Sequence, residues 1–309
     1  MEGKFALVSV CVVTYNSEKT IRETLDSILA QTYPRLELIV SDDRSTDQTV
    51  RICQDWLEKN RERFQNTELI VRDQNGGVAR NLNTAIQAAA GEWVKPIAGD
   101  DLLMPDCIAS NMAFAEREEK ANVIFSKSRD FYTSGENRIV TDSILPGVGS
   151  MRYFQQSAKG QYTTLLSCNF VSAPTQFWRR SFAASNPYQE QYSFCEDWPQ
   201  WLKLTSKGER LYFLDEETVL YRRGESLSSA KDSRFVNPGY FDSCRAFFFN
   251  ERYEPLSKLD PDAAQALRKE FLAGELAVVL MHNRKNLFTR GILFILKRML
   301  GIKRLHFIH

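Results

Sequence analysis

The sequence has few histidines, no closely spaced cysteine pair and no long hydrophobic run. Its three histidines, His282, His306 and His309, all lie in the last 28 residues. The body of the chain therefore cannot use a histidine in serine or cysteine catalysis, and it cannot build a histidine-rich metal site. The six cysteines include no Cys-x-x-Cys pair, which favours reduced thiols in a cytosolic protein over zinc ligands or disulfides. The chemistry of the chain must then use carboxylates.

Charge and hydropathy exclude two further classes of protein. The 40 basic residues are balanced by 39 acidic residues, so no nucleic-acid partner is expected. No stretch of 18 apolar residues exists, which predicts that nothing spans a membrane. The apolar run at 5–13 lacks a small-residue cleavage pattern and predicts a buried strand rather than a signal peptide. We expect a cytoplasmic protein of one or two domains.

The first 125 residues alternate between strand-like and helix-like patterns. Continuous apolar runs predict buried strands, and the segments between them carry apolar residues at helical spacing. Such alternation predicts an α/β fold with a mostly parallel, doubly covered sheet, a Rossmann-like half of the molecule. A less regular half follows, with two more strand-like segments, and then C-terminal helices. The predicted strands are 7–13, 36–40, 69–71, 92–98, 122–125, 211–214 and 218–222.

Acidic pairs follow two of the predicted parallel strands. Asp42 and Asp43 come after the second strand, and Asp100 and Asp101 come after the fourth. Ligands of such sheets bind beyond the carboxyl ends of the strands, where the strand order reverses. Adjacent carboxylates repel one another, and a Mg²⁺-like cation that also binds substrate phosphates would remove that conflict. The alternative at each pair is an ordinary solvated loop.

Asp42 and Asp43 also have a local explanation. The segment 43–47 reads Asp-Arg-Ser-Thr-Asp, which is typical of a turn that caps a helix. One of the two carboxylates can therefore be structural. The other is then free to accept hydrogen bonds from a base or a ribose.

Taken together, these segments resemble the family 2 glycosyltransferases of the GT-A fold. The resemblance covers roughly residues 5–230. Four short patterns occur in the family's order within the first ~100 residues, and three looser ones follow. The matching segments are 10–16 (VCVVTYN), 40–47 (VSDDRSTD), 75–81 (NGGVARN), 91–106 (GEWVKPIAGDDLLMPD), 173–175 (APT), 195–198 (CEDW) and 220–228 (LYRRGESLS).

The resemblance implies a role for each candidate residue. The nucleotide would be held by Thr14, Tyr15, Asn16, Asp43 and Asp100. Arg80 would lie near the diphosphate, and Asp101 would bind Mn²⁺ or Mg²⁺. Asp197 would be the general base that takes the proton of the acceptor hydroxyl, and Glu196 would orient the acceptor or the loop. A carboxylate base of this kind contributes ~10²–10⁴-fold in rate. The alternative for Glu196 and Asp197 is a solvated helix start.

One segment departs from the family pattern. Many relatives carry a histidine after the Tyr-Arg pair, whereas this chain reads Arg222-Arg223-Gly224-Glu225-Ser226. Three alternatives remain open. Water and phosphate complete the metal's ligands, Glu225 substitutes for the histidine, or Arg222 and Arg223 neutralise the diphosphate directly.

The resemblance divides the chain into three segments and gives it a reaction. Residues 1–125 would bind the nucleotide sugar, residues 126–250 would hold the acceptor and the base, and residues 251–309 would form a helical extension. The reaction would be inverting transfer from a UDP-sugar to a glycan or lipid-linked acceptor, in bacterial surface-polysaccharide synthesis such as lipopolysaccharide or capsule. The oligomeric state is not predicted.

Two other functions stay as alternatives. The first is a catalytically silent protein of the same fold that binds nucleotide sugars or glycans. The second is a dinucleotide-dependent oxidoreductase, which is disfavoured because Tyr15-Asn16-Ser17 stands where a glycine-rich turn is needed.

The C-terminal segment 284–309 is basic and apolar. The last 28 residues hold seven Lys or Arg and no acid, interleaved with apolar residues. This pattern suits a helix lying on an anionic membrane, at the inner face of the plasma membrane. A packing helix with a solvated basic face is the alternative.

Overall fold

The computed structural model describes residues 5–135, 137–192, 194–224, 234, 236–284 and 286–299. Its contacts divide the chain into two compact units. The first unit comprises 1–165, 169–190 and 196–224, and the second comprises 166–168, 191–195 and 225–309. The three functional segments expected from the sequence stay a prediction.

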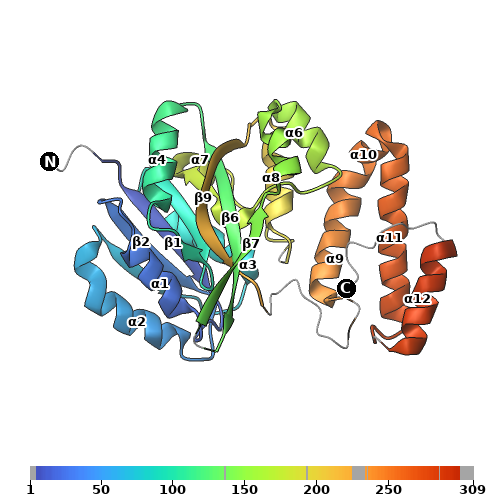
Figure 1. Cartoon of the computed structure of the whole chain (residues 1–309), viewed down its shortest axis with the longest axis horizontal. Helices are drawn as coiled ribbons and strands as arrows, with labels where there is room; N and C mark the ends of the chain where they lie inside the picture. The colour runs from blue at the N-terminus through green and yellow to red at the C-terminus, as the bar shows by residue number, and fades with distance from the viewer. Residues whose placement is uncertain are drawn as a thin grey trace. The chain divides into compact units, whose positions relative to one another are not determined.

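The first unit is built on one mixed sheet (Figure 1). The strand order is β3-β2-β1-β4-β8-β6-β9-β5, with β7 paired to β6. The pairs β3-β2, β2-β1, β1-β4 and β6-β9 are parallel, and the other pairs are antiparallel. The strands are β1 (Val8–Thr14), β2 (Leu36–Asp42), β3 (Thr67–Val71), β4 (Trp93–Ala98), β5 (Leu102–Leu103), β6 (Val123–Ser134), β7 (Asn137–Leu145), β8 (Phe177–Arg179) and β9 (Tyr212–Arg222).

Helices lie between the strands of the first unit and cover its sheet. They are α1 (Ile21–Leu29), α2 (Thr49–Asn60), α3 (Gly77–Ala88), α4 (Cys107–Arg117), α5 (Val148–Met151), α6 (Ala158–Leu165), α7 (Arg180–Ser185) and α8 (Asp197–Ser206). Short 3₁₀ turns occur at η1 (Arg61–Arg63), η2 (Arg152–Gln155) and η3 (Ala173–Thr175).

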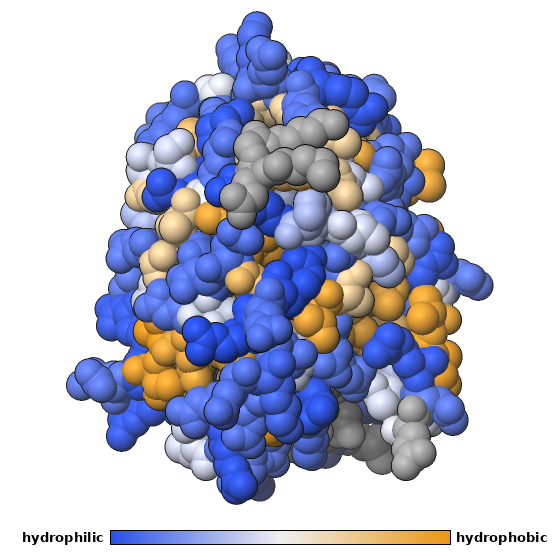
Figure 2. Space-filling view, turned by 90° about the vertical axis from the view of Figure 1, so that its left-hand side faces the viewer, coloured by the Kyte–Doolittle hydropathy of each residue, from blue (hydrophilic) through white to orange (hydrophobic). Residues whose placement is uncertain are grey.

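The parallel strands are buried on both faces, as continuous apolar runs predict. Val8, Val10 and Val12 of β1 pack in one apolar cluster with α1, α2 and α4, while Cys11 faces α3 and donates its thiol to Ala85 O. Figure 2 views this unit from the side of α2 and β2, where the surface is mostly hydrophilic and apolar side chains form separate small groups. The helices therefore cover the apolar faces of the sheet.

The register of the strands brings the predicted acids to one edge of the sheet. Thr14, the last residue of β1, pairs with Asp42 of β2, and Val13 pairs with Ala98 of β4. The order β3-β2-β1-β4 reverses direction between β1 and β4, since β2 and β3 lie on one side of β1 and β4 on the other. The edge beyond Thr14 and Ala98 is therefore the topological switch point at which α/β sheets bind ligands.

The α/β class and the parallel half of the sheet are as predicted from the sequence. The predicted strands 211–214 and 218–222 were wrong as a pair, because they are one strand, β9. Its exposed acids at 215 and 216 look like a break in the sequence, but the strand continues through them with shifts in its register against β6. β6 runs to Ser134, well beyond the predicted end at 125, and forms a hairpin with β7.

The second unit is helical. Its elements are α9 (Pro238–Phe247), the π-helical turn η4 (Phe248–Arg252), α10 (Tyr253–Leu259), α11 (Pro261–Leu280) and α12 (Leu287–Met299). Proline at the first position and a capping side chain begin both α9 and α11, with Asp260 accepting from Ala263 N at 2.9 Å. Phe247, Phe248 and Phe271 form its buried aromatic centre. Among the described residues, no helix is long and apolar enough to cross a membrane.

Candidate active site

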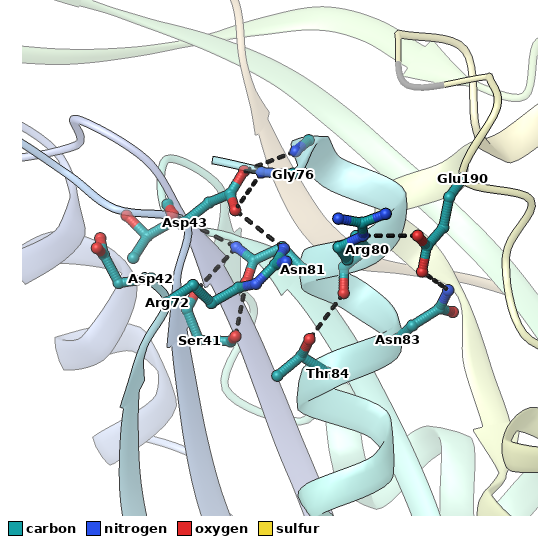
Figure 3. Close-up of polar contacts among 12 residues, drawn as sticks. Ser41, Asp42, Asp43, Arg72, Gly76, Arg80, Asn81, Asn83, Thr84 and Glu190 are labelled. Carbon is teal, nitrogen blue, oxygen red and sulfur yellow. Dashed lines mark hydrogen bonds and ion pairs between the residues drawn. The ribbon is translucent and has the colours of Figure 1, made fainter. Parts of the chain in front are cut away.

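The Asp43 carboxylate at the end of β2 is bound by the protein itself (Figure 3). The residue is 3% exposed. Its Oδ1 accepts hydrogen bonds from Arg72 Nη1 at 3.0 Å and Gly76 N at 2.9 Å, and its Oδ2 accepts from Gly77 N at 2.8 Å. The two oxygens therefore already have three partners, and Asp43 shapes the loop that opens α3.

Asp42 is a turn residue, as the local explanation predicted. Its two carboxylate oxygens accept from Ser45 N at 2.7 Å and Ser45 Oγ at 2.5 Å. Asn16 supports the same loop, because its side-chain oxygen accepts from Thr46 N at 2.8 Å. Its backbone φ of 49° lies in the left-handed region that asparagine tolerates better than most residues. Tyr15, 46% exposed, is the side chain presented beside this loop.

Two glycines allow the backbone amides to reach Asp43. Gly77 has a φ of 81°, which a side chain would strain. A Cβ on Gly76 would lie 2.7 Å from Arg72 Nη1 and from Arg80 Cδ. Gly77 therefore requires glycine, a side chain at Gly76 would displace Arg72 and Arg80, and the Asn-Gly-Gly pattern serves to bind Asp43.

Arg80 follows on α3 and is paired with an acid. Its Nε donates to Glu190 Oε2 at 2.6 Å, and Figure 3 shows the two side chains pointing toward one another. Asn81, the next residue, is buried and ties α3 to β2, since its side chain donates to Ser41 O at 2.9 Å and accepts from Ser41 Oγ at 2.6 Å.

The hydroxyl of Thr14 lies at the switch point with no partner in the described part of the chain. Thr14 is 4% exposed, and its Oγ1 makes no hydrogen bond. It faces Gly99, where an added Cβ would lie 2.9 Å from this oxygen. A buried hydroxyl without a partner costs free energy, so a ligand that binds it would relieve that cost.

Asp100 and Asp101 follow β4, and β9 fixes their loop. Arg222 N donates to Asp101 Oδ1 at 2.9 Å, and Arg222 Nε donates to the backbone oxygen of Asp100 at 2.8 Å. Asp101 is 2% exposed. Burial, followed by the charge of Asp100, raises its pKa well above the usual range. Burial also raises the pKa of Asp100, although the residue as a whole is exposed.

Arg222 is occupied by protein contacts. Besides the Asp100 oxygen, its guanidinium donates to Thr133 Oγ1 at 2.5 Å and Glu23 Oε2 at 3.2 Å, and it lies 4.5 Å above the centre of the Phe131 ring. This geometry makes Arg222 a residue that positions the acidic loop. Its predicted contact with a diphosphate stays a prediction and would require these bonds to change.

Arg223 is more open than Arg222. Its side chain is 50% exposed and pairs with Asp130 at 2.9 Å. Its predicted contact with a diphosphate likewise stays a prediction. Glu225, the predicted substitute for the missing histidine, lies outside the described residues.

Glu196 and Asp197 begin α8, and both are half-buried. Asn169 Nδ2 donates to Asp197 Oδ2 at 3.2 Å. Burial, followed by the charge of Asp197, raises the pKa of Glu196 to about 8, and burial also raises the pKa of Asp197. These two carboxylates are therefore unlike the solvated helix start that was the alternative.

Tyr221 is influenced by both groups of acids whose pKa values are raised. Burial, followed by the charges of Asp101, Asp100 and Asp197, raises its pKa to about 12 against the opposing effect of Arg223. Tyr221 therefore lies within electrostatic range of both Asp197 and the Asp100–Asp101 loop. These acids follow β4 and begin α8, about 100 residues apart in the sequence.

Three residues of this region were missed from the sequence. Tyr221 and Asn169 are ordinary polar residues, and only the fold shows which acid each one meets. Lys95 carried a signal that could have been used, because it is a charge inside a strand that is otherwise apolar. It is completely buried, its Nζ donates to Pro174 O at 2.5 Å and Gln176 O at 3.1 Å, and burial lowers its pKa to about 8.

The acids fit a divalent cation only if a ligand completes the site. No group of three or more His, Cys, Asp or Glu side chains in the described ranges is arranged to hold a metal. Asp100 and Asp101 provide two neighbouring carboxylates whose pKa values are raised by burial and, for Asp101, also by the charge of Asp100. Mg²⁺-like ions commonly take one or two carboxylates and complete their shell with water and phosphate oxygens. The pair fits that arrangement.

These features define an α/β sheet with acidic side chains at its switch point. Comparison with known proteins gives the family: the description "Glycosyl transferase family 2" matches residues 9–183, more than half of the chain. The chain belongs to glycosyl transferase family 2. This finding confirms the resemblance drawn from the sequence and replaces the oxidoreductase alternative.

Curated relatives include bacterial glycosyltransferases. The chain is 27% identical over 290 residues to the poly(ribitol-phosphate) β-N-acetylglucosaminyltransferase TarS of Staphylococcus aureus, which covers 91% of this chain and 45% of TarS. It is 30% identical over 204 residues to the Escherichia coli protein described as UDP-Glc:α-D-GlcNAc-diphosphoundecaprenol β-1,3-glucosyltransferase WfaP, covering 65% of this chain and 71% of WfaP. The chain thus spans less than half the length of TarS.

A solved structure of residues 1–349 of S. aureus TarS in complex with UDP-GlcNAc shares the fold. Its TM-score is 0.57 at 22% identity, and the match covers 96% of this chain and 80% of that chain. This likeness confirms the predicted GT-A type of fold.

Proposed function

We propose that the protein transfers a sugar from a UDP-sugar to an acceptor hydroxyl, with inversion at the anomeric carbon. The observation that supports the proposal best is the position of Asp100 and Asp101 at the switch point of the sheet, fixed there by Arg222, with Asp197 within electrostatic range of the neighbouring Tyr221. The likeness to TarS, solved with UDP-GlcNAc, supports the choice of donor. A mannosyltransferase of Pyrobaculum calidifontis, solved with GDP-Man and Mn²⁺, shares the fold with a TM-score of 0.53 at 17% identity.

The position of each residue indicates its role in the proposed reaction. The exposed Tyr15 and the unpartnered hydroxyl of Thr14 would bind the nucleoside, next to the loop that Asp43 and Asn16 shape. Asp197, oriented by Asn169, would accept the proton of the acceptor hydroxyl while the new carbon–oxygen bond forms and the bond to the diphosphate breaks. Glu196 would orient the acceptor.

Asp101 would hold Mn²⁺ or Mg²⁺, with Asp100 beside it and near the ribose. A cation bound there would neutralise the negative charge that develops on the leaving diphosphate. Arg222 would keep the acidic loop in place through its two bonds to Asp100 and Asp101.

The names of the relatives support a bacterial cell-surface glycan or a lipid-linked intermediate as the acceptor. TarS is named for poly(ribitol-phosphate), and WfaP for a diphosphoundecaprenol-linked sugar. A polysaccharide of this kind is the acceptor class proposed for this chain.

A donor screen tests the proposal. Thermal unfolding is measured with UDP, GDP or NAD, each with and without Mn²⁺, followed by hydrolysis assays with several UDP-sugars. We expect the largest stabilisation from UDP with Mn²⁺, together with slow release of UDP from one UDP-sugar. Stabilisation without any turnover, also in the presence of glycan acceptors, would instead support the silent binding protein.

We also propose that the second unit contacts an anionic membrane through α12. Phe288 and Met299 are each 77% exposed and Ile295 is 57% exposed, and helical spacing puts the three on one face. Arg298, also exposed, lies beside that face, whereas the exposed Arg290 lies on the opposite side of the helix. An apolar face flanked by a basic side chain suits the surface of an anionic bilayer, where a lipid-linked acceptor would lie.

Vesicle sedimentation tests this contact. The protein should sediment with phosphatidylglycerol vesicles and stay in solution with phosphatidylcholine vesicles. The double variant Phe288→Ser/Ile295→Ser should lose this binding, as should removal of 284–309. Val148→Ser, which changes an 88% exposed side chain of the first unit, is the matched control and should bind normally. Equal sedimentation of all variants would refute the α12 contact, but it would not count against the proposed sugar transfer.

A further inference from the structure

The arginine assigned to the diphosphate is held by an acid of the same chain. Arg80 Nε donates to Glu190 Oε2 at 2.6 Å, from α3 to the segment that follows α7 (Figure 3). The hydrogen bond from Arg80 is the main cause that lowers the pKa of Glu190. Arg72, which binds Asp43, adds a smaller effect of the same sign and therefore lies near the same acid.

Glu190 is presented to Arg80 by a fixed piece of backbone. The side chain of Asn83, 9% exposed, donates to Tyr188 O at 3.0 Å and accepts from Tyr188 N at 2.8 Å. Its amide nitrogen is also 3.4 Å from Glu190 Oε1. Asn83 thus clamps the backbone two residues before Glu190, and Asn83 and Arg80 lie on one helix. The ion pair is built into the fold rather than being a chance contact of two long side chains.

The pair is nevertheless easy to displace. The Arg80 and Glu190 side chains are 50% and 39% exposed, and exposed ion pairs contribute little free energy. A diphosphate is a stronger partner, because its several charged oxygens can take two guanidinium hydrogen bonds at once.

We propose that Glu190 is an internal competitor of the donor diphosphate for Arg80. It holds the guanidinium while the site is free, and the diphosphate displaces it when the donor binds. This inference rests on the proposed function and on the place near the diphosphate that the family resemblance implies for Arg80. Glu190 then lowers the affinity for the donor and keeps Arg80 in place between turnovers.

Displacement of Glu190 would also affect the segment of chain that lies near the proposed base, Asp197. Tyr188, clamped by Asn83, is buried, and after burial the charges of Glu196 and Asp197 raise its pKa. Tyr188, two residues before Glu190, is thus within electrostatic range of Glu196 and Asp197 at the start of α8. Release of Glu190 would free one of the contacts that hold this segment to α3.

Calorimetric binding of UDP tests the competition. Glu190→Gln should bind UDP about two- to fivefold more tightly than the wild type, the gain expected when a competing exposed ion pair is removed. Uridine, which has no phosphate, should bind both proteins equally. Arg80→Ala should weaken UDP binding, and adding Glu190→Gln to Arg80→Ala should bring no gain. Asp55→Asn, which removes an acid from the exposed Arg51–Asp55 pair on α2, is the matched charge control.

Each result decides one question. Unchanged or weaker UDP binding by Glu190→Gln would overturn the competition, and so would a gain that persists without Arg80, since that would show simple charge repulsion. If Arg80→Ala binds UDP normally, the assignment of Arg80 to the diphosphate fails as well. If the wild type binds no UDP, the choice of donor itself is wrong. Thermal unfolding of each variant confirms that it is folded.

Discussion

Two acidic pairs follow parallel strands of the same sheet, and their surroundings differ. The carboxylates of Asp42 and Asp43 accept hydrogen bonds from the protein itself, from Ser45, Arg72 and two glycine amides. Asp100 and Asp101 are held mainly through backbone contacts with Arg222; burial raises the pKa values of both, and the charge of Asp100 also raises that of Asp101. A satisfied acid pair shapes a loop, whereas an unsatisfied pair is where a cation and a ligand are expected.

Glu196 and Asp197 resemble Asp100 and Asp101, because burial raises their pKa values as well. The largest effect of a substitution on activity is expected at Asp197. Asp197→Asn should lower the rate of sugar transfer by about 10²–10⁴-fold, because the acceptor hydroxyl would lose its base. UDP affinity should stay within about twofold of the wild type, since removing a base leaves ground-state binding of the nucleotide intact. Transfer assays and calorimetry measure the two quantities. Glu216→Gln, an exposed acid on β9, is the control. Near-normal transfer by Asp197→Asn would mean that the base is another residue.

The satisfied pair should matter most for stability. Asp43→Asn removes the ion pair with Arg72 and weakens the bonds from the Gly76 and Gly77 amides. We expect a loss of about 2–3 kcal/mol in the free energy of unfolding, typical of a hydrogen-bonded charge in a buried place. Urea unfolding measures this change. Asp55→Asn, in an exposed ion pair, should change the same quantity by less than about 0.5 kcal/mol. An equally small effect of Asp43→Asn would break the comparison.

The unsatisfied pair should give the opposite result. Asp101→Asn relieves a buried charge whose pKa is raised, so the protein without metal should be as stable as the wild type or more stable. Its affinity for UDP in the presence of Mn²⁺ should fall by about tenfold or more, because a metal ligand is lost. Binding of UDP without metal should change little. A clear loss of stability in Asp101→Asn would show that Asp101 is structural, like Asp43.

The sequence predicted where the acids lie better than it predicted what they contact. The predicted parallel strands 36–40 and 92–98 put the strand ends, and hence Asp43 and Asp101, at one edge of the sheet. The contacts of Asp43 with Arg72, and of Arg222 with Glu23 and Thr133, join segments from 29 to 199 residues apart, and no local pattern specifies them.

The strand β9 shows the same limit. Its two exposed acids interrupt the apolar pattern, so the sequence predicted two strands where pairing with β6 makes one. Long-range pairing therefore decided both the element and the partners of Arg222.

A change of pH tests the same comparison through a gradual change in stability. Glu196 has a pKa of about 8 in the folded protein, against 4.5 ordinarily. Between these values the folded state keeps a proton that the unfolded state has lost, so this group makes the free energy of unfolding fall as pH rises from about 5 to 8. One proton corresponds to at most about 1.4 kcal/mol per pH unit. Glu196→Gln should remove that part of the slope in urea unfolding at pH 5, 6.5 and 8. If the two slopes are the same, Glu196 is ionised throughout this range, and its carboxylate then has a partner like those of Asp43.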